Sequence, residues 1–188
     1  MNRSLLSVFF LLTASVSVQA QQKLAEDEKL ALLVEVDQIT EATQEGNADV
    51  VLAKTHSAVH QVAGGKKAYE EMMRKLIPQM AASGIVYEEN QIGEPTEVYA
   101  VKRGQICFVP KVSTVRFGEK RMRITSFLIA ARKSARADWL FVDGSGLQKK
   151  PELLWQLFPG LSTEVKPPEN KQEVLAIPPS VVAPIPTH

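Results

Sequence analysis

The order of the periodic segments along the chain predicts an α+β domain, with helices first and antiparallel strands second. Up to Ser83, apolar residues recur at helical spacing, and from Ile85 onward they alternate with polar residues. The chain has 188 residues, of which 45% are hydrophobic and 23% are charged, a balance typical of one globular domain. We therefore expect three N-terminal helices packed on a strongly curved antiparallel sheet of four to six strands.

The first 20 residues have the features of a secretory signal peptide. Arg3 supplies a positive charge, residues 5–18 are uncharged and mostly apolar, and Val18-Gln19-Ala20 places small residues at a cleavage site. The alternative is a membrane anchor, but a spanning helix needs roughly 20 apolar residues. We therefore expect cleavage after Ala20, a periplasmic or secreted product, and no membrane span in the mature chain.

Three helices are expected before the strands begin. In residues 24–45, an apolar stripe at i, i+3, i+4, i+7 spacing predicts one helix; it consists of Leu30, Leu33, Val34 and Asp37, and Val36, Ile39 and Thr40 extend it. A shorter helix is predicted over residues 48–54, whereas residues 55–63 are compatible with a short strand or an irregular turn. The third helix begins near Lys66 and closes at Ser83-Gly84, and Pro78 inside it is expected to bend it.

Alternating segments follow at residues 85–87, 97–102, 105–117, 121–133 and 137–142. Pro110 interrupts the longest of them and cannot donate a ladder hydrogen bond, so it marks an edge position or a bulge. Cys107 is the single cysteine and lies among apolar residues, which predicts a buried thiol and excludes an intrachain disulfide framework.

The C-terminal part of the chain changes in composition. Residues 21–146 contain the predicted α+β domain, and residues 147–166 are an extension in which a short helix is expected around Leu153 and Trp155. Residues 167–188 contain six prolines, which predicts an extended or disordered tail.

Several short motifs in this order resemble the nuclear transport factor 2-like superfamily, which shares the cystatin-like α+β cone. They include Gly64-Gly65-Lys66, Gly93-Glu94-Pro95 and the strand Trp139-Leu140-Phe141-Val142-Asp143, which are similar to those of a group of exported bacterial proteins. The resemblance covers residues 24–146. It implies a cone with a pocket but no particular activity, because the superfamily includes isomerase-like and dehydratase-like enzymes as well as non-catalytic binding domains.

Candidate pocket residues are few, and none matches a catalytic motif. His56 lies where members of this superfamily place residues at the mouth of the cone, whereas Asp37, Tyr69, Tyr87 and Tyr99 could supply the carboxylate base and neutral donor of an isomerase-like site. His56 and His60 have the i, i+4 spacing of some metal sites, but no third ligand is evident, so we expect no metal. No cofactor is expected, since Gly144-Ser145-Gly146 lacks the ending of a phosphate-binding loop.

The charges are unevenly distributed although the net charge is only +1. Acidic residues dominate residues 23–50, whereas residues 101–136 hold ten basic residues against Glu119 alone. Strand alternation places Arg121 and Arg123 on one face, which predicts either a solvated surface or one that attracts an anion or acidic partner. The low net charge and the expected compartment argue against nucleic acid.

Taken together, these features favour an exported, non-catalytic domain that binds a small ligand or another protein. Its expected ligand is a small apolar or anionic molecule. A pocket enzyme with acid–base chemistry and a structural module that forms a homodimer through an open sheet face are the two alternatives.

Overall fold

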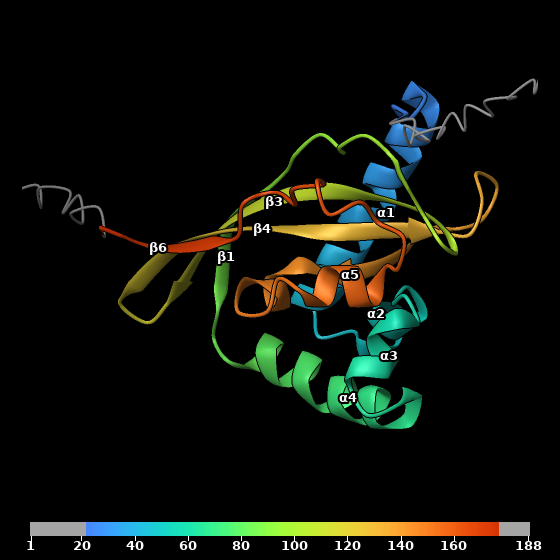
Figure 1. Cartoon of the computed structure of the whole chain (residues 1–188). Helices are drawn as coiled ribbons and strands as arrows, with labels where there is room; N and C mark the ends of the chain where they lie inside the picture. The colour runs from blue at the N-terminus through green and yellow to red at the C-terminus, as the bar shows by residue number, and fades with distance from the viewer. Residues whose placement is uncertain (1–21, 177–188) are drawn as a thin grey trace, which may run out of the picture.

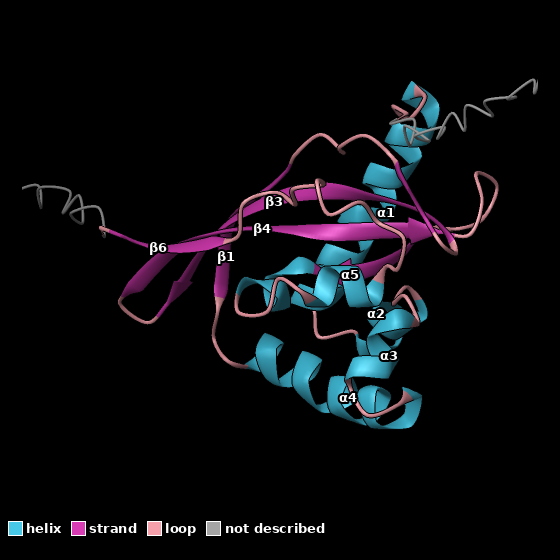
Figure 2. Cartoon of the chain, viewed as in Figure 1, coloured by secondary structure: helices cyan, strands magenta, loops and turns pink. Residues whose placement is uncertain are grey.

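The computed structural model describes residues 22–176, so the predicted signal peptide and the last part of the tail lie outside the described residues. The chain folds as an α+β domain with a six-stranded antiparallel sheet, as predicted (Figures 1 and 2). The elements in chain order are α1 (Glu26–Gln44), α2 (Ala48–Ala53), α3 (Ala58–Val62), α4 (Lys66–Ala82), β1 (Val86–Ile92), β2 (Tyr99–Val101), β3 (Gly104–Phe117), β4 (Lys120–Arg132), β5 (Leu140–Asp143), the 3-10 helix η1 (Gly144–Gln148), α5 (Leu153–Leu157) and β6 (Lys171–Leu175).

The long β3–β4 hairpin is the centre of the sheet. β1 and β2 pair with different halves of β3 on one side, and β5 and β6 pair with different halves of β4 on the other. The turn of the hairpin projects to the left of the helices in Figure 1. Every other strand of the described sheet therefore depends on the register of this one hairpin.

Pro110 lies at the gap between β1 and β2, so β3 is locally an edge there, which is one of the two positions predicted for this proline. β1 ends at Ile92 opposite Lys111, and β2 begins only at Tyr99 opposite Ile106. The Pro110 carbonyl accepts a hydrogen bond from the Gly93 N–H at 2.8 Å on this side of β3. The amide hydrogen that proline lacks would face the same gap, so its absence costs the sheet no ladder bond.

One face of the sheet packs against α1 and α2, and we call the buried residues there the α1-side core. Alternation along β3 and β4 sends Cys107, Val109, Leu128 and Ala130 to this face. Burial raises the pKa of the Cys107 thiol to about 12, in agreement with the predicted buried thiol. The other members of the core are Leu32, Val36, Ile39, Ala42, Ala48, Val51, Ile77, Val98, Trp139 and Phe141.

The opposite face of the sheet is covered by α3, η1, α5 and the segment that follows α5, which form the α5-side core. Phe108 and Phe127 meet edge to face on this side, with their ring centroids 5.6 Å apart. Residues 147–166, expected as an extension, contribute six buried apolar side chains to this core, namely Leu147, Leu154, Leu157, Phe158, Leu161 and Val165. They are thus part of the same folded unit as the sheet.

Four helices precede the sheet instead of three, because the segment without a clear prediction contains α3. This helix is a single short turn between Ser57 and Gly64, too short to produce a periodic signal in the sequence. Helix α4 contacts α1, α2 and α3, and it continues through Pro78 to Ala82, so it closes at Ser83 as predicted.

The buried face of α1 coincides with only part of the predicted stripe, namely Val36, Ile39 and Thr40. Leu30 and Val34 are 61% and 58% exposed, whereas Leu32, Val36 and Ile39 are buried. Apolar residues occur on more than one face of this helix, so its sequence allowed two orientations. The orientation is set by the sheet, since Val36 and Leu32 belong to the core beneath it.

Part of the predicted extended tail forms β6, which pairs with residues 121–125 of β4. Asn170 fixes its start by donating its side-chain amide to the Gly144 carbonyl at 2.8 Å. β6 has no buried side chain, and Val174 is 78% exposed. Within residues 22–176, no helix combines the length and apolar character needed to cross a membrane.

Trp139 should be a major contributor to stability, because its ring is 4% exposed and the Arg132 guanidinium lies 4.2 Å above it. We expect Trp139→Ala to lower the free energy of unfolding by about 3–5 kcal/mol in chemical denaturation. Trp155→Ala is the matched control, since Trp155 is only partly buried, and it should cost less. Equal midpoints for Trp139→Ala and the parent protein would contradict this packing.

Candidate functional site

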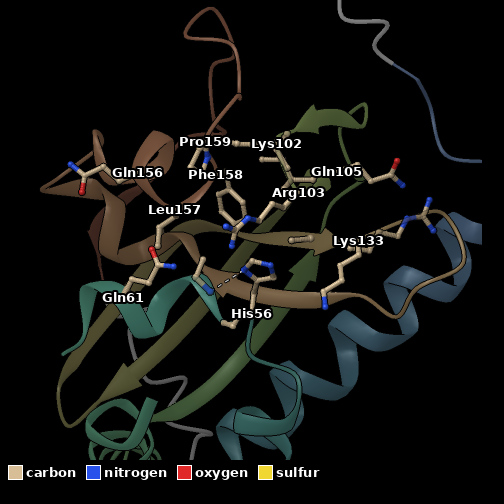
Figure 3. Close-up of a pocket in the computed structure, with 16 residues that line it drawn as sticks. His56, Gln61, Lys102, Arg103, Gln105, Lys133, Gln156, Leu157, Phe158 and Pro159 are labelled. Carbon is tan, nitrogen blue, oxygen red and sulfur yellow. Dashed lines mark hydrogen bonds between the residues drawn. The ribbon is translucent and has the colours of Figure 1, made fainter. Parts of the chain in front are cut away.

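A cavity of about 460 Å³ lies beside the α5-side core (Figure 3). Its walls come from the start of α3, the β2–β3 turn, the end of β4 and the end of α5. This is the face of the sheet opposite α1 and α2, so the cavity depends on residues beyond 146. Its volume is in the range of sites that hold a small organic ligand.

Backbone contacts fix the wall formed by the β2–β3 turn. The Lys102 N–H donates to the Pro159 carbonyl at 2.7 Å, which joins this turn to the end of α5. Gly104 has a φ of 127°, and a Cβ there would lie 2.2 Å from the Arg132 carbonyl oxygen. Only glycine fits this position, so the turn and the end of β4 remain in close contact.

The cationic residues of the lining are not balanced by acidic ones. Lys102, Arg103, Arg132 and Lys133 line the cavity, and no aspartate or glutamate does. Lys102, Arg103 and Lys133 are exposed, and within the described part of the chain none of these three has an ion pair. The cavity therefore has three cationic side chains without a carboxylate partner.

Arg132 differs from the other three because its charge is used inside the fold. Its side chain is 7% exposed, pairs with Glu28 of α1 at 3.1 Å and donates to the Ala135 carbonyl at 2.9 Å. The guanidinium also lies over Trp139. These contacts join α1 to the end of β4 and position the neighbouring Lys133 at the cavity.

His56 provides a neutral hydrogen-bond donor at the cavity. Its Nδ1 accepts from the Ala58 N–H at 3.2 Å, so the ring proton of the neutral form is on Nε2. Burial lowers the pKa of His56, and the nearby charges of His60 and Lys133 lower it further. Its backbone N–H donates to the Phe141 carbonyl at 2.9 Å, which holds the residue beside β5.

The side chains of the cavity converge on one region (Figure 3). Arg103 extends beneath the Phe158 ring toward His56, and Lys133 approaches His56 from the other side. The centroids of the His56 and Phe158 rings are 5.5 Å apart. Gln105 and Gln156 point away from this region. The arrangement thus combines cationic and neutral donors with an aromatic wall.

Of the pocket residues predicted from the sequence, His56 lines this cavity. Asp37 is exposed on α1, and Tyr99 packs against Phe108 with 5.8 Å between ring centroids. His60 lies within α3 and contacts Tyr69, whereas His56 precedes that helix, so the two histidines do not share a helix face. No cluster of three metal-ligating side chains occurs among residues 22–176.

Tyr69 and Tyr87 lie near an aspartate that the sequence did not single out. Burial raises the pKa of both phenols, and the negative charge of Asp143 raises both further. Asp143 itself is exposed, and its carboxylate accepts from the Ser145 N–H at 2.7 Å at the start of η1. The charge of Asp143 thus acts on both phenols, but its carboxylate is exposed to solvent and already caps η1.

The predicted basic residues Arg121 and Arg123 lie far from the cavity along the hairpin. Glu88, at a bulge in β1, accepts from Arg121 Nε at 2.6 Å and from Arg116 Nε at 3.2 Å. Its pKa is lowered chiefly by the hydrogen bond from Arg121. Arg123 is exposed and faces Glu173 of β6 in the strand register. Glu88 therefore neutralises part of this end of the basic segment, whereas Arg123 has no ion pair within the described residues.

The cavity residues missed by sequence reasoning are Lys102, Arg103, Lys133 and Phe158. The first three belong to the basic segment already recognised between residues 101 and 136, but nothing in the sequence distinguished them from Arg121 and Arg123. Their importance depends on the C-terminal segment, which adds an apolar wall from far along the chain.

Comparison with known proteins produced no match: no family model, curated protein or solved structure is similar to this chain.

We expect the stability of the protein to decrease as the pH falls below about 6.5. Because the pKa of His56 is lower in the folded chain than in the unfolded chain, the unfolded chain binds the extra proton first. The loss should level off below the folded-state pKa. Denaturation at several pH values should show this dependence, and His56→Gln should reduce it. An NMR titration that places the pKa of His56 at or above 6.5 would contradict this description of the site.

Proposed function

We propose that the chain is an exported, non-catalytic domain that binds a small ligand in the cavity between α3, the β2–β3 turn and α5. The observation that carries this proposal is the cavity itself, which combines about 460 Å³ of space with an apolar wall and unpaired polar groups. Export is supported by the sequence of residues 1–20, which has the features of a signal peptide.

We also propose that the domain is related to the nuclear transport factor 2-like superfamily. The supporting features are the motifs between residues 24 and 146 and the order of helices before an antiparallel sheet. A curved, cone-like sheet and a homodimer formed through it belong to the same proposal. In this chain the proposed binding cavity lies on the α5 side of the sheet, and the resemblance does not extend to residues 147–166.

A non-catalytic role is favoured by the composition of the cavity lining. An acid–base site of the isomerase type needs a carboxylate base beside a neutral donor. The lining contains His56 as a neutral donor but no aspartate or glutamate. A carboxylate base of this type would have to come from elsewhere in the fold, and Asp143, whose charge acts on Tyr69 and Tyr87, is exposed and caps η1.

Fluorine NMR with a library of small fluorinated fragments would test the proposed binding function. We expect some fragments to bind the parent protein with broadened signals, and this binding to be lost in Gln61→Trp. Gln61 is exposed on α3 and lines the cavity, so a tryptophan there would fill its mouth with little effect on the core.

The matched control is Gln38→Trp, which adds the same ring to an exposed position of α1 outside the cavity. It should bind the fragments as the parent protein does. Binding that survives equally in both variants, or no fragment binding to the parent protein, would contradict a ligand site in this cavity.

A further inference from the structure

We propose that the ligand of this cavity is an organic anion, with an oxyanion group held by Arg103, Lys133 and His56 and an apolar body held by the end of α5. This inference rests on the proposed binding function and specifies the chemistry of its ligand. It assigns separate parts of the ligand to separate walls of the cavity.

The oxyanion group follows from the polar side chains that converge in the cavity. Arg103 and Lys133 carry positive charges with no ion pair within the described residues, and both extend toward His56 (Figure 3). His56 adds a donor, since its Nδ1 is occupied by the Ala58 N–H and its proton is therefore on Nε2. A carboxylate or phosphate oxygen accepts from all three groups, whereas a cationic ligand would meet like charges.

The location of these charges distinguishes them from the other cations of the sheet. Arg132 is paired with Glu28, and Arg121 is paired with Glu88. Arg103 and Lys133 instead face a concave surface with no acidic residue in its lining. A cation beside low-dielectric walls attracts an anion more strongly than one on an open surface does. The cavity is thus the favoured anion site of the described fold.

The apolar body follows from the size and the remaining walls of the cavity. A water molecule occupies about 30 Å³, so a bare inorganic anion would fill only a small part of about 460 Å³. Leu157, Phe158 and Pro159 form a continuous wall at the end of α5, and Val101 and Ile106 face it from β2 and β3. Because these walls are apolar, the part of the ligand that buries them should be an apolar hydrocarbon group.

Isothermal titration calorimetry with four probes tests this inference: phenyl phosphate, benzoate, inorganic phosphate and benzyl alcohol. We expect phenyl phosphate or benzoate to bind about tenfold or more tightly than inorganic phosphate and benzyl alcohol, because only they have both parts. Tighter binding of phenyl phosphate would assign the group as a phosphate, and tighter binding of benzoate would assign it as a carboxylate. A higher salt concentration should weaken the binding of both phenyl phosphate and benzoate.

Variants separate the cavity from the rest of the basic surface. Arg103→Gln and Lys133→Gln each change an exposed side chain without an ion pair in the described structure, and each should weaken binding of the organic anions by about tenfold. Arg123→Gln is the matched control, because Arg123 is also exposed and unpaired within residues 22–176 but lies on the hairpin outside the cavity. It should leave the affinity unchanged.

Three results would overturn the inference. Benzyl alcohol could bind as tightly as the organic anions, or Arg123→Gln could weaken binding as much as Arg103→Gln does. The third such result would be that none of the four probes binds. If the fluorinated fragments still bound in the cavity, only the choice of an organic anion would be wrong. If neither fragments nor probes bound, the proposed binding function would fail as well.

Discussion

Burial of the β3–β4 hairpin on both faces is the constraint on which the rest of this structure depends. Consecutive residues of a strand point to opposite faces, so a strand covered on both sides must be apolar at every position. This explains the continuous apolar run Ile106-Cys107-Phe108-Val109 and its partner Phe127-Leu128-Ile129-Ala130-Ala131. α1 and α2 cover one face, and α3 together with the C-terminal segment covers the other.

The cavity is a consequence of how that second face is covered. α5 and the residues after it pack over Phe108 and Phe127, but they leave a space where the β2–β3 turn and the end of β4 approach Phe158. The hydrogen bond from Lys102 to Pro159 and the glycine at position 104 keep these segments in contact. The same turn that closes the sheet edge thus holds Arg103 in place above His56 (Figure 3).

The sequence predicted the helices and strands of the fold better than it predicted which of their faces would be buried. Alternation and turn residues were sufficient to predict the antiparallel strands, an edge position or bulge at Pro110 and the burial of Cys107, because each depends on local chemistry. The buried face of α1 was predicted only in part: Val36 and Ile39 are buried as expected, but Leu30 and Leu32 fit two different apolar faces and the sheet selects between them. α3 was too short to give a periodic signal.

The candidate site was predicted only in part, and for the same physical reason. His56 was singled out and lies in the cavity, but the free cations were identified as a segment instead of as individual residues. Whether an arginine is free depends on partners distant in the sequence: Glu28 neutralises Arg132, and Glu88 neutralises Arg121. Counting charges within a window cannot detect such pairs, because they form only when the strands and helices meet.

A crystal structure of the protein soaked with phenyl phosphate or benzoate is the most direct test of the central claim. We predict density for the probe in the cavity, with its oxyanion within hydrogen-bonding distance of Arg103, Lys133 and His56 Nε2 and its ring against Phe158. Density for the probe beside Arg121 and Arg123, with none in the cavity, would contradict this account.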